Sequence, residues 1–322
     1  MQIFYCGSEQ QQFETLPKKH LFKKNSMSII AKHIISTVHA PTRLSDYAIG
    51  IFPELPSRKS VKKAIKADRF LVDNKVKNTG YWVETGKTIE LLTDTDSDRK
   101  IFPRRLAIVF EDDFLAVINK PAGLPVSGNF FKTVVNTLSF NLKKSNAVDT
   151  LSKPIPVHRL DGLTSGLLLI SKTSTASIHL GQQFENQQIT KQYQALVMGD
   201  IPKNGIIDIP IDNKESLTHF EVEKSINSLQ SGQLSLVNLF PKTGRTHQLR
   251  IHLASIGCPI LGDSLYGKEG QVLKGKGLFL SAIGLIFRHP ISNEMMNIKI
   301  DAPNKFSRRM ELEEKRWEKF NH

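Results

Sequence analysis

The stretch His158-Arg-Leu-Asp-Gly-Leu-Thr-Ser-Gly-Leu-Leu-Leu-Ile-Ser-Lys172 is the most informative part of the sequence. A charged cluster enters an unbroken apolar run there, and such a run predicts a buried strand over residues 166–171. Asp161 therefore stands at the entrance to a strand. The dipeptide Asp161-Gly162 is also a strong hairpin-turn signal, so a purely structural turn is the alternative interpretation.

Two further segments combine polar groups with structural signals. In Lys242-Thr-Gly-Arg-Thr-His-Gln-Leu-Arg-Ile-His-Leu-Ala-Ser-Ile-Gly257, a glycine loop leads Arg245 into a predicted helix over 246–256, with Thr246 as its N-cap. In Lys191-Gln-Tyr-Gln-Ala-Leu-Val-Met-Gly199, alternation predicts a strand that carries Tyr193. A basic solvated helix and an ordinary packing tyrosine are the structural alternatives for these segments.

The order of predicted elements indicates the fold class. A hairpin is predicted over 108–119, strands over 192–198, 220–226, 234–240 and 278–287, and helices over 134–143 and 175–186. Strands outnumber helices and do not alternate regularly with them. We therefore expect an α+β fold, with a mixed, largely antiparallel central sheet and flanking helices, and not a doubly wound dinucleotide fold.

A separate small module is predicted before this sheet. It has a helix near 43–52, a break at Pro53 and Pro56, a second helix from Ser57, and short strands up to residue 92. The second helix places Val61, Ala64 and Ile65 on one apolar face. Its other face is basic and predicts contact with nucleic-acid phosphates, or else a merely solvated surface: Arg58, Lys59, Lys62, Lys63 and Lys66.

These patterns predict the following organisation. Residues 1–40 form an N-terminal extension of unassigned role, 41–93 a small α/β module with a basic helix, and 94–106 a polar, charged linker. Residues 107–305 form the larger domain that contains the three polar segments, and 306–322 a C-terminal helix or tail of mixed charge.

Composition restricts the function classes. The 322 residues include 44 Lys and Arg against 31 Asp and Glu, a net charge of +13 that favours a polyanionic partner. Cys6 and Cys258 have no neighbouring ligands at metal-binding spacing, which predicts neither a metal nor a disulfide and fits a reducing cytoplasm. The sequence also contains no phosphate-binding loop, no dinucleotide fingerprint, no signal peptide and no membrane-spanning apolar stretch.

Together the three segments resemble the RluA-type pseudouridine synthases from about Ile108 through Pro303. The runs His158-Arg-Leu-Asp and Gly244-Arg-Thr-His-Gln-Leu-Arg250 carry the resemblance, with Gly262-Asp-Ser-Leu-Tyr-Gly267 and Phe287-Arg-His-Pro290 as further landmarks. More loosely, residues 42–92 resemble a small RNA-binding module shared by a ribosomal protein and tyrosyl-tRNA synthetases.

The resemblance implies an isomerase of structured ribosomal or transfer RNA that needs no cofactor or metal. Asp161 would be the catalytic aspartate, adding to the ribose or removing a ribose proton, Tyr193 would pack against the flipped uracil, and Arg245 would keep the carboxylate ionised. Arg159, His247 and Arg250 would bind RNA in the same cleft. We expect a monomer.

Gly162 and Leu163 depart from the family pattern, since many relatives have an arginine and an acidic residue there. Ser281 likewise stands where a histidine is common. The main alternative is therefore a non-catalytic RNA-binding protein that keeps the synthase fold. A metal-dependent nuclease is a weaker alternative, because the chain lacks the carboxylate cluster of two-metal chemistry.

Overall fold

A computed structural model describes residues 29–38, 40–52, 55, 57–92, 101–267 and 275–320. Most of the predicted 1–40 extension, Cys6, both prolines of the predicted break and residues 94–100 of the predicted linker lie outside these ranges. The described residues belong to two compact units, one drawn from Met1–Leu44 and Ala64–Ser97, the other from Ser45–Lys63 and Asp98–His322.

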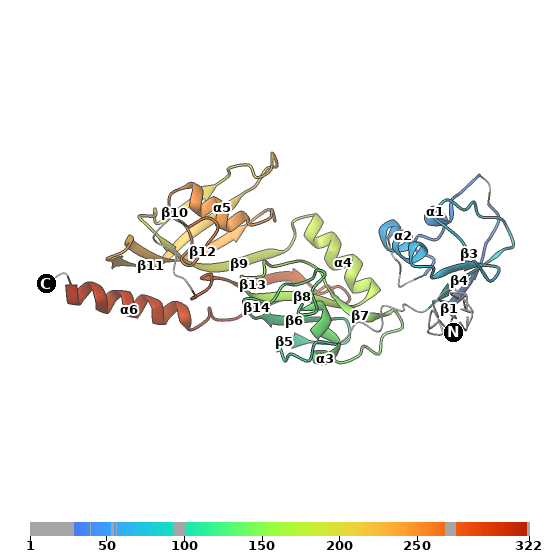
Figure 1. Ribbon diagram of the computed structural model, residues 1–322, viewed down its shortest axis with the longest axis horizontal. Helices are drawn as coiled ribbons and strands as arrows, with labels where there is room; N and C mark the ends of the chain where they lie inside the picture. The colour runs from blue at the N-terminus through green and yellow to red at the C-terminus, as the bar shows by residue number, and fades with distance from the viewer. Residues whose placement is uncertain are drawn as a thin grey trace, which may run out of the picture. The chain divides into compact units, whose positions relative to one another are not determined.

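The first unit contains a four-stranded antiparallel sheet in the order β1-β4-β2-β3 (Figure 1). Its strands are β1 (Ile29–Ile34), β2 (Phe70–Val72), β3 (Lys75–Val76) and β4 (Thr88–Leu92). Phe70, Ile89 and Leu91 are buried because the apolar positions of β2 and β4 face the core. The short strands predicted up to residue 92 are thus present as β2, β3 and β4, whereas β1 was not predicted.

Two helices, α1 (Leu44–Tyr47) and α2 (Arg58–Lys66), contain residues near the division between the units. Helix α1 is shorter than predicted, since turns follow it and Gly50 has a left-handed φ of +74°. In α2 the apolar residues Val61, Ala64 and Ile65 are buried. Its five basic residues, Arg58, Lys59, Lys62, Lys63 and Lys66, are exposed, as the amphipathic pattern predicts.

The second unit is built on a sheet with ten strands among the described residues, in the order β10-β11-β12-β9-β13-β8-β6-β5 (Figure 1). β14 pairs with β13, and β7 with β8. Of these pairings only β8 with β13 is parallel, so the predicted mixed, largely antiparallel α+β fold is confirmed. The strands are β5 (Ala107–Glu111), β6 (Leu115–Lys120), β7 (Thr150–Pro156), β8 (Ser165–Thr173), β9 (Thr190–Met198), β10 (Asn204–Ile207), β11 (Thr218–Ser228), β12 (Gly232–Pro241), β13 (Leu280–Arg288) and β14 (Met295–Lys299).

The helices of this unit are α3 (Leu138–Asn141), α4 (Ser174–Glu185), α5 (Gln248–Ser255) and α6 (Lys305–Phe320). Helix α3 is shorter than predicted because a 3₁₀ turn precedes it and Leu142 is extended. Helix α4 begins after Thr173, whose hydroxyl accepts a hydrogen bond from the amide of Ala176. Helix α6 packs against β11 through Phe306 and Met310, which are buried.

The centre of the sheet explains why the first quoted segment needs its second glycine. Gly166 has φ +110°, and a Cβ there would lie 2.1 Å from the carbonyl oxygen of Ala282 in β13. One residue earlier, the Ser165 hydroxyl donates to the Ser281 hydroxyl at 3.1 Å. Close approach of β8 and β13 therefore fixes the start of β8, immediately after the turn that holds Asp161.

Candidate active site

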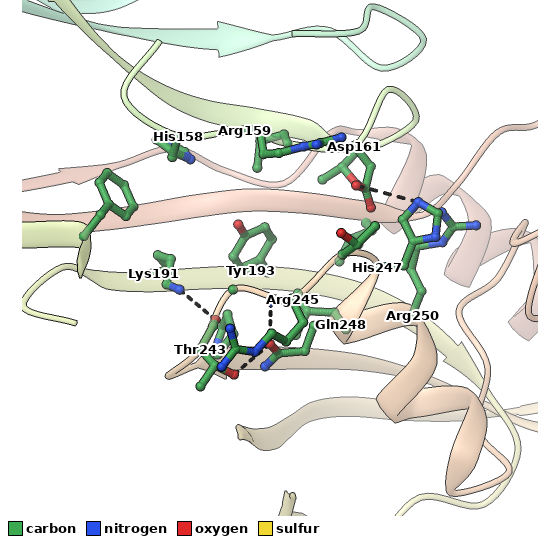
Figure 2. A pocket seen from close by; sticks show the side chains of 18 of the residues that line it. His158, Arg159, Asp161, Lys191, Tyr193, Thr243, Arg245, His247, Gln248 and Arg250 are labelled. Carbon is green, nitrogen blue, oxygen red and sulfur yellow. Dashed lines mark hydrogen bonds and ion pairs between the residues drawn. The ribbon is translucent and has the colours of Figure 1, made fainter. Parts of the chain in front are cut away.

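A cavity of about 290 Å³ lies beside the central strands, and most of the sequence-predicted site residues line it (Figure 2). Asp161 comes from the turn before β8, Tyr193 from β9, Arg245 and His247 from the loop between β12 and α5, and Arg250 from α5 itself. Strands β12, β9, β13 and β8 are consecutive in the sheet, so residues distant in the sequence converge at one place.

Asp161 is held by a turn whose backbone is tied on both sides. The amide of Thr164 donates to the Asp161 carbonyl at 3.1 Å, and the amide of Gly123 donates to the Gly162 carbonyl at 2.8 Å. The carboxylate is 21% exposed, and Nε2 of His247 lies 3.8 Å from its Oδ1 (Figure 2). The turn interpretation and the site interpretation of Asp161-Gly162 are therefore compatible.

Lys120, at the end of β6, stabilises this turn through hydrogen bonds to backbone carbonyls. Its side chain is fully buried, and its ammonium donates to the carbonyls of Leu124 at 2.8 Å and Gly162 at 3.2 Å. Burial lowers the pKa of Lys120 to about 8, while the charge of Asp161 acts in the opposite direction. Lys120-Pro-Ala-Gly predicts a rigid loop from sequence, but nothing local indicates that the lysine turns inward.

The loop before α5 differs from the prediction at its cap. The N-cap is His247, with a left-handed φ of 56°, and the prediction of Thr246 is wrong because the Gln248 side chain closes the loop instead. Oε1 of Gln248 accepts from the Arg245 amide at 3.0 Å and from the Thr243 hydroxyl at 2.7 Å. His247 is thereby directed toward Asp161, and its Nδ1 contacts the Tyr266 hydroxyl at 3.0 Å.

The two arginines of this segment have different surroundings. Arg245 is exposed, its Nε donates to the Glu215 carbonyl at 3.0 Å, and its guanidinium points away from Asp161 in Figure 2. Among the described residues, no ion pair within 4.0 Å joins Arg245 to Asp161. The structure therefore brings both residues to one cavity without pairing them.

Arg250 is 4% exposed and makes a bidentate pair with Asp263, with both N–O distances at 2.7 Å. Burial lowers the pKa of Arg250, but the hydrogen bonds that Arg250 donates to Asp263, and then the charges of Asp263 and Asp161, outweigh burial and raise it. Arg250 is therefore a permanent cation within the electrostatic reach of Asp161. Asp263 and Tyr266, which contact the Arg250 guanidinium, both belong to the segment Gly262–Gly267. The acidic residue of that segment was the sequence feature that could have indicated a buried partner for an arginine.

Tyr193 is partly buried in the cavity wall. Burial, and then the negative charge of Asp161, raise the pKa of the Tyr193 hydroxyl above its ordinary value, so the phenol is neutral at physiological pH. Its ring also packs against two of the apolar clusters of this unit. Tyr193 is thus both a packing residue, as the structural alternative predicted, and a residue of the cavity that Asp161 lines.

Two other polar residues, His158 and Lys191, line the cavity. Nε2 of His158 accepts a hydrogen bond from the amide of Leu169 at 3.0 Å, and burial, followed by the charge of Lys191, lowers the pKa of His158 to about 4. The Lys191 ammonium donates to the Thr243 carbonyl at 2.9 Å. Burial lowers the pKa of Lys191 to about 8. The sequence patterns predict no function for either residue.

Arg159, which the resemblance also assigns to RNA binding, is exposed and lines the cavity. Within the described ranges, no group of three or more His, Cys, Asp or Glu residues could hold a metal ion. No described helix is both long and apolar enough to cross a membrane.

Comparison with known proteins gives a consistent result. Residues 114–255 match the family described as RNA pseudouridylate synthase. An uncharacterized RNA pseudouridine synthase of Aquifex aeolicus is 32% identical over 292 residues, covering 82% of this chain and 91% of the relative. Ribosomal large subunit pseudouridine synthase C of Rickettsia typhi is 32% identical over 302 residues, covering 84% and 97%.

A solved structure is similar as well. Human RNA pseudouridylate synthase domain containing 4 superposes with a TM-score of 0.53 at 26% identity, covering 64% of this chain and 92% of that chain.

Proposed function

The chain belongs to the RNA pseudouridylate synthase family, and from that membership we propose which of its residues act and on which RNA. The enzyme isomerises uridine in RNA to pseudouridine. The bond between ribose C1′ and uracil N1 breaks, C1′ joins C5, and the C5 proton is exchanged for one on N1. The reaction leaves no net redox change, so the protein's tasks are to extrude, hold and reorient the base.

Asp161 is the catalytic carboxylate of this proposal. The observation that carries it is the convergence of a held carboxylate, an aromatic ring, an imidazole and a permanent cation in one cavity: Asp161, Tyr193, His247 and Arg250. A carboxylate can add to C1′ or remove a ribose proton, and both routes require it to be ionised. The Tyr193 ring provides an apolar face against which the extruded uracil packs.

The basic residues around Asp161 have different proposed roles. Arg250 supplies a permanent positive charge near the carboxylate, because Asp263 orients its guanidinium, and Nε2 of the His247 ring lies 3.8 Å from Oδ1 of Asp161. The family resemblance suggests this part for Arg245, but the contact of its Nε with Glu215 leaves it at the surface. Arg245 and Arg159 instead meet the RNA backbone at the rim of the cavity.

Large-subunit ribosomal RNA is the proposed substrate, since relatives of comparable length carry that substrate in their names. The basic face of α2, within the proposed module 41–93, adds phosphate contacts that are independent of sequence. Loops and bulges favour base extrusion, so a structured rather than a fully paired site is expected. The monomeric state and the cytoplasmic location remain predictions.

The test is a pseudouridine-specific map of total RNA from three strains: the intact gene, a deletion, and Asp161→Ala. Loss of the same large-subunit rRNA sites in both altered strains supports the substrate and the role of Asp161. Sites kept by the Asp161→Ala strain but absent from the deletion would contradict that role. If neither strain lost a site while purified protein bound rRNA, the binding-only alternative would replace this proposal.

A further inference from the structure

The cavity contains a cation that the roles assigned so far leave unused. Lys191 lies on β9 two residues before Tyr193, and strand alternation puts both side chains on the same side of the sheet. Both line the cavity that Asp161 lines. In the view of Figure 2, Tyr193 lies between Asp161 and Lys191.

The charge of Lys191 has little compensation in this structure. Its one hydrogen bond among the described residues goes to the Thr243 carbonyl at 2.9 Å, and no described carboxylate lies within 4.0 Å of it. An ammonium has three donor hydrogens, so at least two are available to a ligand in the cavity. Gly244 lies close to the ammonium, since a Cβ at that position would be 4.0 Å from Nζ of Lys191. Because glycine has no side chain, the space beside Nζ is not filled from this position.

The position of the target nucleotide follows from the proposed function, on which this inference rests. If C1′ is at Asp161 and uracil packs on Tyr193, the far edge of the base, with its carbonyl oxygens, faces Lys191. Cleavage of the C1′–N1 bond leaves the electron pair on uracil, and the resulting anion spreads its charge onto those oxygens. A fixed cation at that edge stabilises the detached base more than the intact nucleotide.

We propose that Lys191 is a catalytic residue that binds the detached uracil by donating a hydrogen bond to one of its carbonyl oxygens. The ammonium keeps its proton throughout. The charge on uracil is consumed when C5 bonds to C1′, after which C5 loses its proton and N1 gains one. Lys191 also keeps the free base in the cavity while it turns.

The surroundings of Lys191 simplify a pH test. From the β7–β8 connection it faces His158, which is neutral above pH about 4, and from its own strand it faces Tyr193, which burial keeps neutral. From the loop before α5 it faces Arg245, which stays charged. Lys191, with a pKa lowered to about 8 by burial, is therefore the group on this side of the cavity whose charge changes between pH 7 and 9.

The experiment measures single-turnover pseudouridine formation and RNA affinity on a large-subunit rRNA transcript, for wild type, Lys191→Met, Lys191→Arg and Lys242→Met. Lys242 is the matched control, an exposed lysine outside the cavity lining. Lys191→Met should lose about 100-fold in rate, the usual effect of removing one such donor, with Kd changed less than about threefold. Lys191→Arg should keep most activity and move the alkaline fall in rate, near pH 8 in wild type, to higher pH.

Three results would overturn the inference. The first is a wild-type rate in Lys191→Met. The second is weaker binding with a smaller salt dependence but an unchanged rate, which would assign Lys191 to a phosphate. The third is an unmoved alkaline limb in Lys191→Arg, and this decides the matter even if Lys191→Met does not fold. Failure of the wild type itself to form pseudouridine would instead refute the proposed rRNA substrate.

Discussion

The basic face of α2 and the cations around the cavity carry the same charge in opposite surroundings. Lys62, Lys63 and Lys66 of α2 are exposed, so solvent and salt screen them. Arg250 and Lys120 are buried and held by fixed oxygens. Exposed cations of this kind attract RNA without selecting a site, whereas held cations act on particular atoms.

The largest effect should come from the best-held cation. Arg250→Gln leaves Asp263 as a buried charge without its bidentate partner, which typically costs about 3–5 kcal/mol of unfolding free energy. Urea unfolding of this variant, with Arg245→Gln as control, measures the difference. Equal stability of the two variants would show that the Arg250–Asp263 pair is no more important than a surface contact.

A backbone change sharpens the comparison, because it alters no charge. Gly166→Ala should destabilise the enzyme by roughly 2 kcal/mol or more, since the strained φ and the 2.1 Å approach to Ala282 force β8 away from β13. The Asp161 turn should shift with β8, so the pseudouridine rate should fall as well. Gly181→Ala, at an uncrowded position of α4, is the control; similar behaviour of both variants would contradict the account.

The pH dependence of stability tests the held groups in another way. The pKa of His158 is lower in the folded chain, about 4, than its ordinary value of 6.5. Between these pH values the unfolded chain binds more protons, so stability is full above pH about 6.5 and falls as pH drops toward 4, on the order of 2 kcal/mol. Urea titrations of wild type and His158→Gln should show the smaller fall for the variant; identical pH profiles would exclude this contribution.

The smallest effect on catalysis is expected at α2. Lys62→Gln with Lys63→Gln should weaken rRNA binding and reduce the slope of log affinity against log salt by about 0.7–0.9 for each phosphate that the variant no longer neutralises. The single-turnover rate at saturating enzyme should stay within about twofold, because no residue of α2 lines the cavity that Asp161 lines. An unchanged salt slope would remove α2 from the RNA-binding surface.

Sequence patterns were sufficient for the central strands, because their apolar runs are long and β8 is buried along its whole length. β7, β10 and β14 were missed, since their side chains are mostly half-buried or exposed and no buried apolar run marks them in the sequence. The sequence placed Asp161 and Tyr193 in one site, and both residues line the cavity. Their catalytic roles stay predictions.

The two arginines show why the rest could not be predicted. Arg245 and Arg250 are five residues apart in one segment, and no local pattern distinguishes them. Which of them turns inward depends on Asp263, thirteen residues further along, and on the left-handed backbone at His247. Both are tertiary features, since helix propensity gives no reason to cap α5 with a histidine.

The most direct test of the account is a single-turnover assay of Asp161→Asn on a large-subunit rRNA transcript that the wild type modifies. The amide keeps the size of the side chain but cannot add to C1′ or take a proton. We predict a rate reduced by at least about 1,000-fold, with RNA affinity and the urea unfolding midpoint close to wild type. A rate within about tenfold of wild type would contradict the assignment of Asp161 as the catalytic carboxylate.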